Sequence, residues 1–107
     1  MIDVTEQNFQ EVLGSKKITL LQFSAEWCGP CKTLSPIVKK VSEENEGKDL
    51  TIGKVNVDSD APVAARFNVR NIPTLIYLDK KGEVLFKSVG AQEQKTIQSK
   101  LDELLNN

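Results

Sequence analysis

The sequence predicts an α/β fold built on one mixed β-sheet, and three observations support this. Short apolar runs of strand length alternate with amphipathic stretches of helical period along the 107 residues. Residues 79–82, Asp-Lys-Lys-Gly, are typical of the turn of a hairpin that joins the last two apolar runs. A hydrophobic content of 39% with 27% charged residues suits a folded globular chain. This length accommodates one domain but not two, so we expect a single domain over residues 1–107.

The first half of the chain predicts strand, helix, strand and helix. After a strand-like start, Thr5 as N-cap and Gly14 as stop bound a short helix with one apolar face. Residues 18–25 form a nearly continuous apolar run, as expected for a strand buried on both faces. Pro30 opens a longer amphipathic helix, which Gly47 closes.

The second half predicts strand, helix, a strand hairpin and a final helix. Asp60 or Ser59 is expected to cap the short helix. The predicted strands are residues 50–57, 74–78 and 83–89, and the last helix covers residues 93–105. Strands separated by helices pair in parallel, whereas a hairpin pairs antiparallel. The order β-α-β-α-β-α-β-β-α therefore predicts a central mixed five-stranded sheet flanked by four helices.

Charge and hydropathy narrow the classes of partner. The chain carries 14 basic and 15 acidic residues, a net charge of −1, which gives no reason to expect binding to nucleic acid or to a membrane surface. No apolar run approaches the roughly 20 residues of a membrane span, and the first residues lack the pattern of a signal peptide. We therefore expect a cytoplasmic protein, and a monomer.

Two cysteines, Cys28 and Cys31, are the only ones in the chain, and there is no histidine. They lie where the first long strand meets the second helix, and a thiolate is favoured at a helix N-terminus. Residues three apart on a helix are about 5–6 Å apart, which is within disulfide reach. We therefore predict a reversible dithiol, with Cys28 attacking and Cys31, one turn deeper, resolving. Half of a zinc site shared between two chains is the alternative, since zinc needs four ligands; no metal site is expected within one chain.

The segment Trp-Cys-Gly-Pro-Cys-Lys at residues 27–32 resembles the active-site motif of the thioredoxin family. Further landmarks match it in order over essentially the whole chain: Phe23, Ala25-Glu26, Pro36, residues 54–58 (Lys-Val-Asn-Val-Asp), Ile72-Pro73-Thr74, Gly82 and residues 89–91 (Val-Gly-Ala). The resemblance implies a thioredoxin fold, in which Trp27, Gly29, Pro30 and Lys32 support the two cysteines.

The resemblance also implies a substrate-binding surface beside the disulfide. Its members would be Trp27, Ile72, Pro73 and Gly90, with a cis peptide between Ile72 and Pro73. From the residues alone, Trp27 could be a partly buried packing residue, Pro73 an ordinary trans proline and Gly90 a simple turn glycine.

Two positions depart from the family pattern near the cysteines. Gln22 occupies the place of a usual buried Asp that is thought to serve the proton of Cys31, and Ser24 stands where Trp is common. Gln22 cannot titrate, so it is expected to be a buried amide whose partner is Lys54 or an ordered water. Lys54 matches the lysine that usually neighbours the acid, so Gln22 and Lys54 are candidates either for a proton path or for buried polar positions without such a role.

The resulting hypothesis is a general protein-disulfide reductase, a thiol–disulfide oxidoreductase of the thioredoxin type. The resemblance implies no bound cofactor, disulfide-containing protein substrates, and electron transport from NADPH through a flavoprotein thioredoxin reductase. A disulfide oxidase or isomerase is the alternative among enzymes, although Gly29-Pro30 resembles the reducing members more. Outside enzymes, the alternative is a thioredoxin-fold binding or assembly subunit with incidental redox activity.

Overall fold

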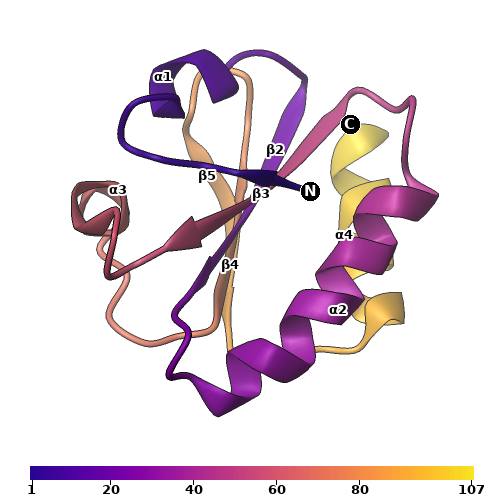
Figure 1. Ribbon diagram of the computed structural model, residues 1–107. Helices are drawn as coiled ribbons and strands as arrows, with labels where there is room; N and C mark the ends of the chain where they lie inside the picture. The colour runs from indigo at the N-terminus through magenta and orange to yellow at the C-terminus, as the bar shows by residue number, and fades with distance from the viewer.

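A mixed sheet of five strands runs through the middle of the molecule in the computed structural model, which describes residues 1–107 (Figure 1). The strands are β1 (Ile2–Asp3), β2 (Ile18–Ser24), β3 (Leu50–Asn56), β4 (Thr74–Leu78) and β5 (Val84–Val89). Their spatial order is β1-β3-β2-β4-β5. β1, β3 and β2 are parallel, whereas β4 is antiparallel to both β2 and β5. The predicted mixed sheet and its strand number are confirmed.

The central strand, β2, carries the chain into the cysteine segment, and all seven of its residues are buried. Gln22 lies opposite Lys54 of β3 on one side and Leu75 of β4 on the other. Successive side chains point to opposite faces of a strand. Leu20 accordingly packs into one core and Leu21 into the other. Because β2 is hydrogen-bonded on both edges and buried on both faces, its C-terminal end, where the cysteine segment starts, is held in place.

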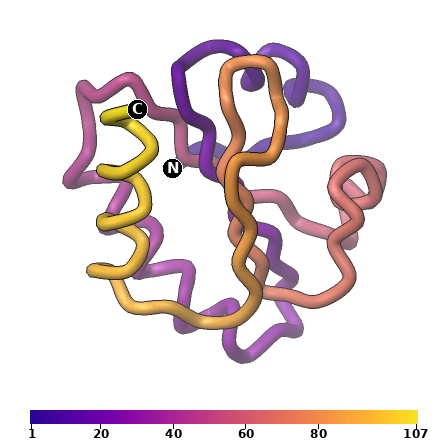
Figure 2. Tube along the Cα trace, turned by 180° about the vertical axis from the view of Figure 1, so that it is seen from behind, coloured from indigo at the N-terminus to yellow at the C-terminus, as the bar shows by residue number.

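Two helices cover each face of the sheet, as Figure 1 and the reverse view in Figure 2 show. They are α1 (Phe9–Val12), α2 (Gly29–Glu44), α3 (Ala61–Arg66) and α4 (Gln94–Leu105). α2 and α4 bury one apolar cluster against the sheet: Ile18, Leu20, Leu34, Val38, Val41, Ile52, Leu75, Tyr77, Ile97, Leu101 and Leu104. α1 and α3 cover a second: Val4, Phe9, Val12, Leu21, Phe23, Val55, Val63, Ala64, Ile76 and Leu78. None of the helices combines the length and the apolarity needed to cross a membrane.

The first helix is shorter than the sequence predicts, because Thr5 starts a turn rather than the helix. The Thr5 N–H donates to Asn8 Oδ1 at 2.8 Å, and the Asn8 N–H donates to Thr5 Oγ1 at 3.2 Å. These reciprocal bonds are those of a capping box, but the residues that they enclose form a turn, and α1 itself begins only at Phe9. Asp60 occupies the N-cap position of α3 as predicted, but its carboxylate accepts the backbone N–H of Glu6 at 3.0 Å instead of capping the helix.

The hairpin turn lies where the sequence predicts it. Gly82 has a φ of +85°, a left-handed conformation that glycine adopts without steric cost. Its N–H donates to the carbonyl of Asp79 at 3.0 Å, and Asp79 Oδ1 accepts the N–H of Glu83 at 2.9 Å. β5 then starts at Val84, one residue later than predicted.

Candidate active site

The two cysteines form a disulfide across the first turn of α2. Cys28 is the N-cap of this helix, and its Cα lies 5.3 Å from that of Cys31. The backbone N–H of Cys31 donates to Cys28 Sγ at 3.2 Å. Gly29 and Pro30 fill the turn between them, where a proline loses no intrahelical hydrogen bond. The start of α2 therefore directs a free N–H, and the positive end of the helix dipole, at the sulfur of Cys28.

Both sulfur-bearing residues are enclosed in the disulfide form. Cys28 is 5% exposed and Cys31 is 2% exposed, and they form a small buried cluster with Ala25. The half-buried side chains of Val57 and Ile72 pack against this cluster. Cys28 is thus only slightly more exposed than Cys31 in this state, because neighbouring apolar side chains cover both residues.

Trp27 projects from the surface next to the disulfide, and its side chain is 70% exposed. Its indole Nε1–H donates to Asp58 Oδ2 at 2.8 Å. Asp58 is itself held by Asn56, whose Oδ1 accepts the N–H of Asp58 at 2.9 Å and of Ser59 at 3.2 Å. The turn after β3 thus fixes the orientation of an exposed aromatic ring, which excludes the interpretation of Trp27 as a packing residue.

The segment before β4 lies beside the two cysteines. The Ile72–Pro73 peptide is cis, which confirms the expectation from the family resemblance. Gly90, at the end of β5, has a φ of +100°, and its N–H donates to the Pro73 carbonyl at 2.8 Å. Ile72, Pro73 and Gly90 are therefore held together next to the disulfide. Lys32, the last residue of the motif, is exposed on α2 and forms no ion pair.

Gln22 is fully buried, as the sequence predicts, but its partner within the protein is not Lys54. Its Nε2 donates to Ser35 Oγ of α2 at 2.9 Å, and its Oε1 has no hydrogen-bond partner. Lys54 lies opposite Gln22 in the sheet, yet its side-chain ammonium forms no hydrogen bond and no ion pair within the protein. The Ser35 hydroxyl, one helical turn after Cys31, is therefore the hydrogen-bond partner of Gln22 that Lys54 was expected to be.

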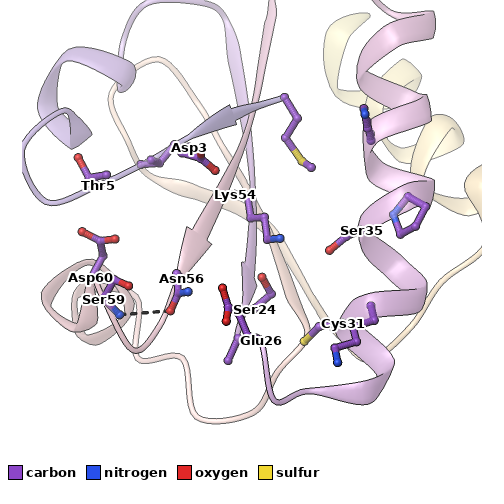
Figure 3. A pocket seen from close by; sticks show the side chains of 16 residues that line it. Asp3, Thr5, Ser24, Glu26, Cys31, Ser35, Lys54, Asn56, Ser59 and Asp60 are labelled. Atoms are coloured by element: carbon purple, nitrogen blue, oxygen red, sulfur yellow. Dashed lines mark hydrogen bonds between the residues drawn. The ribbon is translucent and has the colours of Figure 1, made fainter.

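An open pocket of about 1130 Å³ lies between α2 and the end of β3, on the side of Cys31. Figure 3 shows the Cys31 sulfur and the Ser35 hydroxyl of α2, and the Lys54 ammonium of β3, directed into it. Ser24, at the end of β2, and Glu26, in the loop after it, line the same pocket. Cys28 and Gln22 are not among the lining residues. The polar side chains of this pocket therefore lie beside Cys31, whereas Cys28 does not border the pocket.

The fold and this site can be compared with known proteins. Residues 1–103 match the family model described as Thioredoxin. The chain belongs to the thioredoxin family. It is 42% identical over 102 residues to Thioredoxin 2 of Chlorobaculum tepidum, covering 94% of this chain and 92% of the relative. It is 41% identical over 107 residues to thioredoxin of Buchnera aphidicola subsp. Acyrthosiphon pisum, covering 99% of this chain and 97% of that one.

Solved structures agree with this membership. A mutant thioredoxin from Halobacterium salinarum has a TM-score of 0.86 and is 28% identical, covering 97% of this chain and 89% of that chain. The thioredoxin fold predicted from the sequence is confirmed. The chain is a thiol–disulfide oxidoreductase, a protein-disulfide reductase whose redox-active centre is the Cys28–Cys31 pair. Thioredoxins carry electrons on this disulfide and need no bound cofactor.

Sequence reasoning did not assign a role to two residues of this site, Asp58 and Ser35. Asp58 belongs to the matched segment 54–58, but no pattern in the sequence pairs it with the indole of Trp27. Ser35 had a usable signal, because a residue four positions after Cys31 lies on the same face of the helix. A buried amide on the neighbouring strand is then a suitable partner for its hydroxyl.

Proposed function

We propose that Cys28 is the attacking thiolate and Cys31 the resolving thiol of this reductase. The observation that carries the assignment is the hydrogen bond from the Cys31 N–H to Cys28 Sγ at the start of α2. In the reduced protein this donor and the helix dipole stabilise a negative charge on Cys28. Cys31 receives no corresponding backbone donor, so it stays protonated longer and acts second.

The reaction then proceeds in two exchange steps. The Cys28 thiolate attacks one sulfur of a substrate disulfide, and the other substrate sulfur leaves as a thiolate that takes up a proton. Cys31 loses its proton and attacks Cys28 Sγ, which releases the second substrate thiol and closes the Cys28–Cys31 disulfide. Two electrons and two protons pass to the substrate, and the protein is oxidised.

The substrate backbone is expected to lie across Trp27, Ile72, Pro73 and Gly90. Trp27 is an exposed and oriented aromatic ring, which suits contact with a peptide. At Gly90 an added Cβ would meet no atom within 4 Å, so this position leaves room for an approaching chain. The residues of this surface bring the substrate disulfide towards the cysteines and take no part in the electron transfer.

The cellular setting follows from the family rather than from the site. We infer that the whole chain, residues 1–107, works as one monomeric thioredoxin domain in the cytoplasm. A flavoprotein thioredoxin reductase re-reduces the disulfide with electrons from NADPH, and disulfide-containing proteins are the substrates. The named relatives, which match over more than nine-tenths of their own length, support this assignment.

The test is reduction of insulin disulfides, coupled to a thioredoxin reductase and NADPH. We expect the wild-type protein to be active, Cys28→Ser to be inactive, and Cys31→Ser to accumulate a mixed disulfide. A mixed disulfide that forms through Cys31 in Cys28→Ser would reverse the two roles. Equilibration with glutathione separates a reductase from an oxidase, because a reductase has the lower reduction potential. Cellular function that survives Cys28→Ser/Cys31→Ser would favour a binding or assembly subunit.

A further inference from the structure

The pocket described above connects Cys31 to solvent on the side away from the substrate surface. Cys31 is 2% exposed and lines this pocket, so the pocket is the route by which its thiol proton reaches solvent. The pocket that it lines is open and is also lined by Ser24, Ser35 and Lys54. Figure 3 shows the Ser35 hydroxyl and the Lys54 ammonium on the same side as the Cys31 sulfur. Proton exchange at Cys31 therefore takes place next to a hydroxyl and a cation.

Ser35 is the link between this pocket and the buried strand beneath it. Its Oγ accepts the Nε2–H of Gln22 at 2.9 Å, and Gln22 is 0% exposed and does not reach the pocket. A serine hydroxyl that accepts one hydrogen bond still has its own hydrogen to donate. With the oxygen held from the sheet side, that hydrogen is available to the pocket. Gln22 thus orients Ser35 without touching Cys31.

Two further oxygens show that the surroundings of this pocket are polar and incompletely paired. Gln22 Oε1 and Ser24 Oγ are buried and have no hydrogen-bond partner in the protein. Lys54 brings a positive charge without a carboxylate partner. Because buried polar groups are normally paired with protein or water, the unpaired Ser24 hydroxyl, which lines the pocket, favours solvent within it. A hydroxyl donor, an ammonium and solvent together stabilise a thiolate better than a thiol.

We propose that Ser35 is a positioning residue for the resolving step, acting on the proton of Cys31. The inference rests on the proposed roles of the two cysteines. The Cys31 S–H bond breaks, its proton passes to pocket solvent, and the thiolate is stabilised by the Ser35 hydroxyl and by Lys54. The thiolate then attacks Cys28 Sγ, and the departing substrate sulfur takes up a proton from solvent. No further oxidant or reductant is needed.

Other charged groups surround the same pocket and contribute to any pH dependence measured there. They are Asp3 of β1, Glu26 of the loop before α2, Lys32 and Lys39 of α2, Lys54 of β3 and Asp60 of the loop before α3. The amino terminus at Met1 also borders it. A change of Ser35 to Ala leaves all of these groups in place. The difference between the variant and the wild type therefore reports the hydroxyl.

The experiment follows the reduced protein with an aromatic disulfide whose thiol product is coloured, in a stopped-flow instrument. The first product thiol reports attack by Cys28, and the second reports resolution by Cys31. We expect Ser35→Ala to slow the second phase roughly tenfold, through loss of a hydroxyl donor from the pocket beside the Cys31 thiolate, and to move its pH midpoint upward. The first phase should be unchanged, and Ser35→Thr should restore the second.

Two further variants keep the proposal open to refutation. Ser42→Ala removes a half-buried serine from the same helix outside the pocket, and both phases should match the wild type. Gln22→Leu frees the Ser35 hydroxyl, so it should also slow the second phase. The double variant Gln22→Leu/Ser35→Ala contains no unpaired amide, and it should be no slower than Ser35→Ala alone if Gln22 acts through Ser35.

The outcomes separate this inference from the proposed function. Absence of a second phase in the wild type would refute the roles given to the two cysteines. A normal second phase in Ser35→Ala, or equal slowing of both phases, would refute the role of Ser35 and leave the reductase assignment intact.

Discussion

Replacing Gln22 by Asp places an ionisable group at a fully enclosed polar position of the sheet. Gln22 is 0% exposed, and its amide donates to Ser35. The matched control is Gln22→Asn, which has the same shortened side chain but carries no ionisable group. Both variants remove one methylene, at a pH-independent cost of about 1 kcal/mol. The difference between them isolates the ionisation of the carboxyl group.

The size of the pH-dependent difference in unfolding free energy follows from two opposing effects on the pKa of the Asp carboxyl. Full burial raises its folded pKa above the unfolded value of about 3.9, while the unpaired Lys54 on the neighbouring strand lowers it. A net rise of about one to two units corresponds to about 1.4–2.7 kcal/mol. The folded pKa is the higher one, so the unfolded chain loses its proton first as pH rises. Relative to Gln22→Asn, the Asp variant therefore loses stability as pH rises from the unfolded to the folded pKa of this carboxyl. The loss is complete above the folded pKa.

The assay is chemical denaturation of both variants at acidic and at neutral pH. The Asp variant should match the Asn variant in acid and fall below it at neutral pH by the amount given above. All other carboxyl groups are common to the two proteins and cancel in the comparison. Identical differences at the two pH values would show that position 22 is not enclosed as the structure shows. The same pair also tests whether an added carboxyl changes the pH profile of disulfide reduction.

Three further predictions concern the reduced thiols and two single aromatic residues. Brief alkylation near neutral pH should label Cys28 before Cys31, because only Cys28 Sγ accepts a backbone N–H; peptide mapping that finds the reverse would contradict the assignment. The fluorescence of Trp27, the only tryptophan, should change on reduction because the ring adjoins Cys28. Equal spectra of the oxidised and reduced forms would mean that the ring does not sense the sulfur. Asp58→Ala should lower the fluorescence polarisation of Trp27, because it removes the hydrogen bond that holds the ring. Burial raises the pKa of Tyr77 to about 12, so the stability that its neutral form contributes should be complete below about pH 10 and lost as pH rises towards 12. Tyr77→Phe should abolish this component in alkaline denaturation, and ultraviolet titration of the single tyrosine in wild-type protein should give the same pKa.

Much of the fold could be predicted because the chain signals its elements locally. The apolar run at residues 18–25 identified the central strand, and Gly82 identified the hairpin turn at its observed place. The first helix was predicted too long: Thr5 and Asn8 make the reciprocal bonds of a helix start, but residues 6–8 form a turn and the helix begins only at Phe9. Such a choice between a turn and a helix depends on side-chain geometry that spacing alone does not contain.

The site divides in a similar way. The position of the cysteine pair at a strand-to-helix junction follows from C-x-x-C spacing and Pro30, which are local signals. The partner of Gln22 could not be predicted, because Lys54, Ser35 and water all satisfy a buried amide and only the packing of α2 on β2 chooses between them. The enclosure of the two cysteines also depends on a distant segment, since Ile72 packs against the cluster that they form with Ala25.

The enclosure of β2 has a consequence for the kind of substrate this protein can reduce. A strand that is hydrogen-bonded on both edges and buried on both faces exchanges its backbone hydrogens only when the whole domain opens, whereas the two-residue β1 should fray freely. The loop with Cys28 follows directly from this rigid strand, so it has little freedom to adjust to a partner. The partner must then supply the motion. We expect that disulfides in locally mobile segments are reduced much faster than equally exposed disulfides in rigid ones.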